Sequence, residues 1–492
     1  MDSMREKKDR LSSLPESILV LILSFLPTHD AVRTMLVKKS FCTLWTLLSS
    51  LDLDDGCFDF CDLIDDDDDD YTGSITQDLP FFIFVRNVLM RHERPQIDKF
   101  RVSITTMLYW DIERRSLGHE LETWMTFALR KQVKVLEFIG GMIEPGYDLF
   151  KWSHVFVSDS LVELRLEAIN MNSLTHVRLS SLRILRLIMV DMSGGALGQI
   201  IQGSPSLMEL EIYNCGDLSM LSFAAPNIEN LKVDISLFSF SYGEEDDLIL
   251  LRINCPNIKS FEFTGFVDTV DFINLSSLVD VNFNLSSRRP VFKEFQKFTT
   301  ALKILAHAER VALSNEFVTV NVISILLLLY FYRQVLFYCM LKEGPQILIN
   351  WKHVKLGIWL TEKHIHGLNC TLTSLQQLEE LVIDVTNGHS DFTKAIEAQL
   401  DDDMLDGEDC WRSLKRVSIH NIANSSFAVL ISLTDLLLRK ASVLNELAFY
   451  YNAKDQATEE ACNLTLEQLS EFSQKLPTLS KASRHVNICC IN

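Results

Sequence analysis

The sequence predicts an α/β protein with an N-terminal helical segment, an irregular solenoid of short strands and a C-terminal capping segment. Three observations support this prediction: apolar residues at helical spacing near the N-terminus, a short apolar pattern that recurs through the middle of the chain, and two acidic runs between these parts. The 492 residues suffice for several domains or for one extended repeat array. With 47% hydrophobic and 23% charged residues, the composition is that of a globular protein.

Residues 8–53 are predicted to fold as three helices. Ser13 followed by Glu16 has the pattern of a capping box, so the first helix should begin here. Pro27 should end it, because the residue before a proline avoids the α region. Thr28 is expected to cap a second, short helix. The third helix is predicted from apolar residues at helical spacing, namely Phe41, Leu44, Trp45 and Leu48.

The first of these helices is apolar on nearly all sides between Leu14 and Leu26. A helical unit of this size cannot bury so much apolar surface by itself. Either the following domain, which the helices would then cap, or a partner protein is expected to cover the remainder. The helical segment is expected to fold as a unit separate from the repeats.

An unbroken acidic run, Asp65–Asp70, follows the helical segment. Like charges at this density repel one another and stay solvated, which indicates a linker. Metal binding is the less favoured interpretation, because consecutive side chains do not converge on one ion. Residues 54–96 are therefore predicted to be an acidic linker followed by a connecting helix over Leu79–His92.

A repeated pattern, L-x-x-L-x-L with conservative apolar replacements, dominates residues 97–400 and continues beyond them. Its last two apolar positions lie two residues apart and share one face of a short strand, whereas the first belongs to the turn before it. Pro205, Pro226 and Pro256 stand just before repeat starts, where proline favours a turn. One such strand cannot bury its face alone, so the strands should stack into a leucine-rich-repeat solenoid of uneven repeat length. The repeats start at Ile97, Val133, Leu161, Leu182, Leu207, Ile228, Ile258, Leu278, Ala308, Trp351, Leu378, Leu414 and Leu444.

Residues 318–341 are the most apolar stretch and do not fit the repeat. Their length is compatible with a membrane span, but Asn321, Arg333 and Gln334 interrupt them. The favoured interpretation is an irregular insert buried within the solenoid, so a membrane is not an expected partner.

Residues 401–492 follow a second acidic run and are predicted to alternate strand, helix, strand, helix and strand. The helices are expected through Leu433–Ala441 and around Leu466–Lys475, and the last strand near Val486–Ile488. This arrangement is suited to capping the exposed end of a solenoid.

The N-terminal segment resembles an F-box in its Leu14-Pro15, Ile18, Ile22-Leu23-Ser24, Leu26-Pro27 and Trp45. More narrowly, the chain is similar to plant F-box proteins with leucine-rich repeats and a C-terminal FBD segment. In that family the F-box binds a Skp-type adaptor of a cullin–RING (SCF) ubiquitin ligase. The resemblance thus implies a Skp-type adaptor, and through it a cullin, as partners. It assigns adaptor binding to Leu14, Pro15, Ile18, Leu19, Ile22, Leu23, Leu26, Pro27, Val32, Phe41 and Trp45.

The chain departs from the family at Lys38–Cys42, where a Ser-Lys-Arg-Trp-Arg-like run is usual. Phe41 stands where the family has tryptophan, and two arginines are missing. The alternative hypothesis is therefore a non-catalytic leucine-rich-repeat scaffold with a degenerate F-box.

Charge and composition favour protein partners over other classes. The net charge of −20 argues against a phosphate-binding surface, so nucleic acid is not an expected partner. The cysteines form no CxxC pair and are expected to be free thiols in a reducing compartment, and the charged N-terminus does not resemble a signal peptide.

No motif in the sequence predicts catalysis. It has no Gly-rich phosphate loop, HExxH or GxSxG. His364 and His366 lie close in sequence but lack a third metal ligand nearby, and Cys370 and Cys410 lack a histidine at a spacing that could activate them. We expect no enzymatic activity, cofactor or metal.

The resemblance implies that the chain is a substrate-recognition subunit of an SCF-type ubiquitin ligase. The F-box would bind the adaptor and the repeats would bind an unidentified target protein, with the ligase acting in the nucleus and/or cytoplasm. Such a subunit acts by proximity, because tethering raises the concentration of the target near the transferred ubiquitin.

Overall fold

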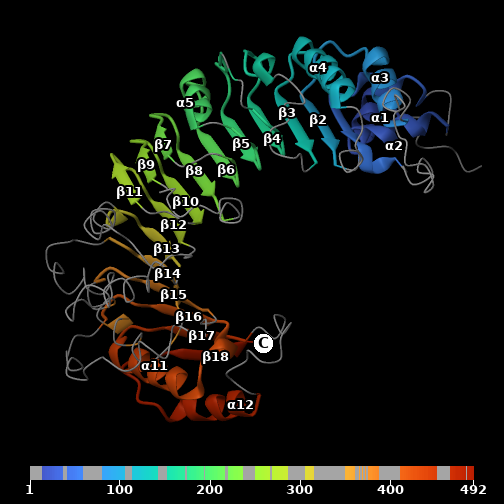
Figure 1. Cartoon of the computed structure of the whole chain (residues 1–492). Helices are drawn as coiled ribbons and strands as arrows, with labels where there is room; N and C mark the ends of the chain where they lie inside the picture. Colours follow the sequence, from blue (N-terminus) through green and yellow to red (C-terminus); the bar gives the residue numbers. More distant parts are fainter. Residues whose placement is uncertain are drawn as a thin grey trace, which may run out of the picture. The chain divides into compact units, whose positions relative to one another are not determined.

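The computed structural model divides into two compact units, Met1–Leu218 and Ser219–Asn492 (Figure 1). It describes residues 14–36, 41–58, 80–105, 114–141, 152–171, 174, 176–192, 194–216, 220–236, 250–265, 269–285, 305–314, 350–358, 360, 365, 368–369, 372, 375–386, 411–451, 466–483 and 485–491.

The first unit contains a sheet whose strands run parallel and follow one another in chain order. Its strands are β1 Ser50–Asp54, β2 Lys99–Ile104, β3 Val135–Gly140, β4 Glu163–Glu167, β5 Ile184–Ile188 and β6 Glu209–Tyr213. Its helices are α1 Glu16–Leu23, α2 Thr28–Arg33, α3 Pro80–Arg91, α4 Arg114–Arg130 and α5 Gly194–Gly203. Short 3-10 turns include η1 Thr34–Leu36, η3 Leu44–Leu47, η4 Asp55–Cys57 and η8 Trp152–His154.

The second unit contains a parallel sheet of the same kind and a smaller one. The main strands are β8 Asn230–Asp234, β10 Ser260–Gly265, β12 Asp280–Leu285, β13 Arg310–Leu313, β14 His353–Ile358, β15 Glu380–Val385, β16 Arg416–His420, β17 Glu446–Tyr450 and β18 Asn487–Ile491. The smaller sheet has the order β11-β9-β7, with β7 Met220–Ala224, β9 Leu250–Asn254 and β11 Thr269–Ile273. The helical elements are η11 Ile422–Asn424, α11 Phe427–Lys440, α12 Leu466–Lys475 and η13 Leu476–Thr478.

The predicted repeat pattern is confirmed in every copy. The last two apolar residues of each repeat lie on the buried side of one strand, and the first is buried in the turn before it. The turn repeats as well: the amide of the first apolar residue donates to the carbonyl three residues earlier, as from Leu207 to Ser204 (3.1 Å) and from Ile258 to Cys255 (3.1 Å). Pro205 lies inside such a turn, where its fixed φ is favourable.

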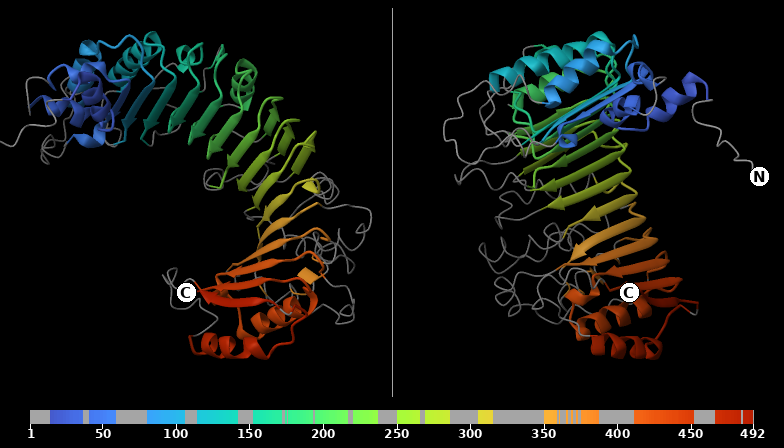
Figure 2. Two further views of the ribbon diagram at one scale, coloured as in Figure 1. Left: turned by 180° about the vertical axis from the view of Figure 1, so that it is seen from behind. Right: turned by 90° about the vertical axis from the view of Figure 1, so that its right-hand side faces the viewer.

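In each unit, helices cover the buried side of the main sheet (Figure 2). Phe127 of α4 contacts Phe100 of β2 with ring centroids 6.2 Å apart, and Phe472 of α12 contacts Phe449 of β17 at 5.0 Å. The small sheet plays the same role where helices are absent from the described part of the second unit, since Phe272 of β11 packs on β10 and β12. One side of each main sheet is thereby left to solvent.

The N-terminal helices differ from the prediction in their ends. Helix α1 begins at Glu16 with Pro15 as its N-cap and no side-chain cap, and Ser13 lies outside the described residues. Thr28 is the first residue of α2, and its cap position is occupied by Pro27. The predicted third helix is only the 3-10 turn η3, because β1 begins three residues after that turn ends.

Strand β1 was not predicted, although Leu48, Leu51 and Leu53 have the repeat pattern. The same stretch also fits helical spacing, and a short apolar run does not distinguish the two periods. The sheet therefore starts at Ser50, before the boundary expected at residue 97. The small sheet of β7, β9 and β11 was also missed.

The connecting helix and the C-terminal elements are confirmed. Helix α3 matches the helix expected over Leu79–His92, and β16, α11, β17, α12 and β18 alternate as predicted for residues 401–492. Ser426 caps α11 by accepting from the amide of Val429 (3.4 Å).

Predictions for Asp65–Asp70 and for residues 318–341 lie outside the described residues. Within the described part of the chain, none of the helices combines the length and the apolar character that crossing a bilayer requires. The proposed domain boundaries stay predictions.

Candidate protein-interaction surfaces

Helix α1 packs one side on the rest of the first unit and exposes the other. Leu19 and Leu23, four residues apart, are 5% and 2% exposed and anchor α1 beside η3. The opposite side forms what we name the α1 apolar surface, with Phe25 as its most exposed side chain at 80%. Its members are Leu14, Ile18, Leu21, Ile22, Phe25 and Leu26.

The structure separates the predicted adaptor-binding residues into two groups. Leu14, Pro15, Ile18, Ile22, Leu26 and Pro27 are exposed, and Val32 is half-buried. Leu19, Leu23, Phe41 and Trp45 are buried in this chain, which does not favour direct contact with a partner, and the assignment of adaptor binding to all of these residues stays a prediction. The buried ones lie on the inner sides of the helical elements, where they fill the core.

Two members of the α1 apolar surface, Leu21 and Phe25, were not predicted from the sequence. Met35 and Leu36 of η1 are also exposed, at 40% and 78%. The reason is physical: a helix that is apolar on all sides has no periodicity from which to assign its inner side. Leu21 and Phe25 are four residues apart, which places them on the same side of a helix, and this spacing was the one signal that could have grouped them.

The N-terminal helices share a core with the first strands. The Asp52 amide donates to Oγ1 of Thr28, which is 1% exposed, over 2.7 Å and joins β1 to α2. The ring of His29 lies against Phe58 at 4.9 Å and Phe84 at 5.6 Å. These helices thus belong to one compact unit with β1–β6, and the expectation that they fold separately from the repeats stays a prediction.

The solvent-facing side of β1–β6, which we name the first-unit face, carries a network of charges. Arg186 contacts Glu163, Glu209 (3.0 Å) and Glu211 (2.9 Å). Arg101 contacts Asp52 (2.6 Å), Asp54 (3.1 Å) and Glu137 (3.9 Å). Further contacts on this face are Lys99–Glu137 (2.7 Å) and Arg165–Glu167 (2.8 Å). Each of the two arginines is shared among three carboxylates that come from the two neighbouring strands.

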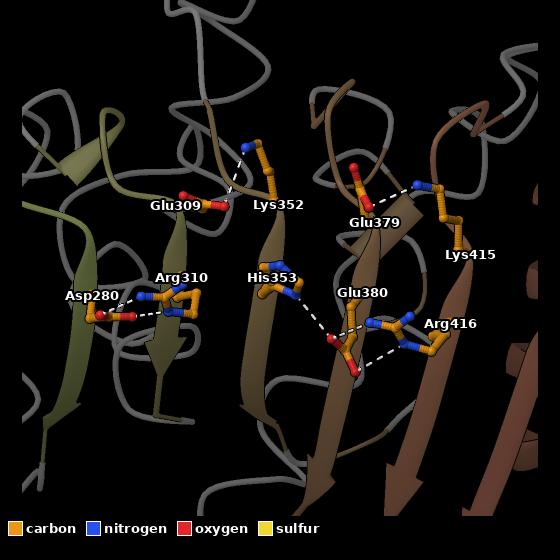
Figure 3. Close-up of polar contacts among 9 residues, drawn as sticks. All are labelled: Asp280, Glu309, Arg310, Lys352, His353, Glu379, Glu380, Lys415 and Arg416. Atoms are coloured by element: carbon orange, nitrogen blue, oxygen red, sulfur yellow. Dashed lines mark hydrogen bonds and ion pairs between the residues drawn. The ribbon is translucent and has the colours of Figure 1, made fainter.

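The solvent-facing side of β8, β10 and β12–β18, the second-unit face, carries ion pairs between neighbouring strands (Figure 3). Arg310 forms two contacts with Asp280 directly opposite, one of them 2.7 Å long. Glu380 lies between His353 (2.9 Å) and Arg416 (3.1 Å), which are its register partners on either side. The hydrogen bond from Arg416 holds the pKa of Glu380 below its ordinary value, and His353 adds to this.

A second row of pairs joins the turns that precede these strands, again seen in Figure 3. Glu309 pairs with Lys352 (3.2 Å) and Glu379 with Lys415 (2.8 Å). Lys415 lowers the pKa of Glu379 by its hydrogen bond and its charge. In each pair the carboxylate belongs to one repeat and the lysine to the next described repeat. Because opposite charges attract, these pairs favour the observed placing of the two strands side by side.

Chemistry-bearing groups do not gather elsewhere in the described part of the chain. There, no group of three or more histidine, cysteine, aspartate or glutamate side chains could hold a metal ion. Burial raises the pKa of the Cys215 thiol to about 12, which keeps it protonated and unreactive. His364, His366, Cys370 and Cys410 lie outside the described residues, so the expectations about them stay predictions.

Stacked short parallel strands with one buried apolar side define a leucine-rich-repeat protein. A family model described as "At1g61320/AtMIF1, LRR domain" matches residues 88–486. The chain therefore belongs to this leucine-rich-repeat family and, as its sequence predicted, to the plant F-box/FBD/LRR-repeat proteins.

Three similar proteins come from Arabidopsis thaliana. F-box/FBD/LRR-repeat protein At2g04230 is 27% identical over 316 residues, which are 62% of this chain and 64% of that protein. F-box/FBD/LRR-repeat protein At4g26340 is 27% identical over 61% of this chain and 65% of its own length. FBD-associated F-box protein At1g66310 is 26% identical over 57% and 58%. The chain thus spans less than two thirds of the length of these relatives.

Proposed function

We propose that this chain is a substrate-recognition subunit of an SCF-type ubiquitin ligase and has no catalytic activity of its own. In this proposal residues 8–53 are the F-box, residues 54–96 the linker and connecting helix, residues 97–400 the main repeats and residues 401–492 the FBD segment. A Skp-type adaptor binds the F-box and brings a cullin, while the repeats bind the target. The ligase acts in the nucleus and/or cytoplasm.

The α1 apolar surface is the observation that supports adaptor binding. Single exposed apolar residues are common, but here six lie on one short helix and in the residues just before and after it, and apolar patches of this kind mark protein interfaces. Covering such side chains is favourable by about 25 cal/mol per Å² of apolar area. The relatives named as F-box proteins identify which partner is expected.

Burial of Phe41 bears on the alternative of a scaffold with a degenerate F-box. Because Phe41 is only 6% exposed, its replacement of the family's tryptophan changes the core and leaves the α1 apolar surface in place. This favours adaptor binding over the scaffold hypothesis.

Affinity capture of the full chain by a purified Skp-type adaptor tests the proposal. Ile22→Asp and Phe25→Asp should each abolish capture, because a charge would be buried in the interface. Met90→Asp is the matched control, since Met90 is an equally exposed apolar residue (81%) on α3. All three variants should unfold at nearly the wild-type temperature. Capture that survives both α1 substitutions, or no capture of the folded wild type, would reject the proposal.

A further inference from the structure

The first-unit face carries more negative than positive charge. Its solvent-facing positions hold seven carboxylates (Asp52, Asp54, Glu137, Glu163, Glu167, Glu209 and Glu211) and four cations (Lys99, Arg101, Arg165 and Arg186). Seven carboxylates and four cations leave an excess of three negative charges at these positions. Arg186 and Arg101 are each shared among three carboxylates, so neither arginine is the partner of one carboxylate alone.

The glutamates of this network are mostly covered by neighbouring side chains. Glu137 and Glu211 are 16% exposed, and the side chain of Arg186 is 25% exposed. Water and salt screen partly buried charges less than open ones. A cation brought to this face by a partner would therefore gain more than it would at an open acidic surface.

Apolar side chains lie directly beside these charges on the same face. Four of them are half-buried. Val135 and Ile139 of β3 lie opposite Glu163 and Glu167 of β4, and Ile184 and Ile188 lie on either side of Arg186 along β5. Tyr213 of β6 is opposite Ile188. Apolar and aromatic contacts surrounded by charge are typical of the core of a protein interface.

From these observations we infer that the first-unit face, centred on Arg186 and its three glutamates, binds a protein segment in which lysine or arginine residues are interspersed with apolar ones. The inference rests on the proposed function, in which the repeats bind a target, and adds the chemistry of that target. An acidic segment is rejected by the same face, because it would add to the uncompensated negative charge.

Binding of a fluorescent peptide of interspersed lysine and leucine residues to the full chain tests the inference. Any basic peptide is attracted to a protein of net charge −20, so the place of binding decides the outcome. Three comparisons isolate it: the same peptide with glutamate for lysine, the same peptide with glycine for leucine, and variants of the protein. Both altered peptides should bind about tenfold more weakly or worse.

Glu209→Gln combined with Glu211→Gln should weaken binding of the lysine–leucine peptide about tenfold. The matched control, Glu309→Gln combined with Glu379→Gln, removes equal charge from the turn row of the second unit and should leave binding unchanged. A photoreactive form of the peptide should label β3–β6 in the wild type, which keeps the test valid if the first variant fails to fold.

Equal binding of the acidic peptide, equal loss in both double variants, or labelling outside the first unit would each overturn the inference. Adaptor capture reports separately on the proposed function. If the adaptor is captured but the peptide labels other regions, the inference fails alone; if the peptide binds as expected but no adaptor is captured, the proposed ligase role fails.

Discussion

The two sheet faces have the same strand geometry but distribute their charges differently. On the second-unit face and its turn row, one cation typically meets one carboxylate, as in Arg310–Asp280 and Lys415–Glu379, and these side chains are well exposed. On the first-unit face, Arg186 is shared among Glu163, Glu209 and Glu211, all of them less exposed. Exposed pairs contribute little to stability and mainly favour one strand order. A shared, partly buried cation such as Arg186 is expected to contribute more to the stability of its unit. The carboxylates that share it still carry excess negative charge, which a positively charged partner can meet.

Arg186→Ala should produce the largest difference between the units. It leaves three partly buried carboxylates without their common cation, and removing one partner of a buried charge network is costly. We expect a loss of about 2 kcal/mol in the free energy of unfolding of the first unit. Urea denaturation followed by hydrogen exchange in β4–β6 would measure it, and a loss below the experimental error would mean that solvent already compensates these glutamates.

Arg310→Ala is the counterpart in the second unit. Because the Arg310 side chain is 51% exposed, losing its pair with Asp280 should change stability by no more than about 0.5 kcal/mol. The same denaturation measurement serves, read from β12 and β13. A cost as large as that of Arg186→Ala would remove the distinction between the two faces.

Acid should act on the two units in different pH ranges. His92 in the first unit is buried, its Nε2 donates to the Leu48 carbonyl (2.9 Å), and burial with nearby Lys131 and Arg94 lowers its pKa below the ordinary 6.5. The unfolded chain then binds a proton before the folded chain does, so stability present above pH 6.5 falls as the pH drops below it. His92→Gln should flatten this loss in β1 and α3, as measured by hydrogen exchange from pH 7 to 5.

In the second unit, the lowered pKa of Glu380 gives stability that is present above its ordinary value of 4.5 and lost as the pH falls through the lower folded-state value. Glu380→Gln should therefore lower the stability of β14–β16 at neutral pH, and its difference from wild type should disappear as the pH falls below 4.5 and Glu380 becomes protonated. The effect should be the smallest of the set, because Glu380 is one-third exposed.

The sequence predicted the repeat positions well because each copy combines a turn with two apolar residues on one side of a strand, as in Leu207, Leu210 and Ile212. It failed where one stretch satisfied two periods, as at β1, and where a helix was apolar on every side, as in α1. The burial of Leu23 and the exposure of Phe25 depend on what α1 packs against, and that is decided by contacts distant in sequence.

The shared Arg186 was beyond sequence analysis for a similar reason. Glu163 and Glu209 come from repeats on either side of Arg186 in the chain, and only the register of β4, β5 and β6 brings them together. Glu379 and Lys415 of the turn row also come from different repeats and are neighbours only in the folded chain.

The proposed roles are distinct: the apolar surface on α1 is proposed to bind the adaptor, and the charged face on β1–β6 is proposed to bind the target. Titration calorimetry of the full chain at low and high salt tests them most directly, with purified Skp-type adaptor in one series and the lysine–leucine peptide in the other. Adaptor binding should be nearly independent of salt and lost in Phe25→Asp, whereas peptide binding should weaken with salt and persist in Phe25→Asp. Salt-sensitive adaptor binding that survives Phe25→Asp, or no binding of the adaptor to the folded chain, would show that the α1 apolar surface is not the adaptor-binding site.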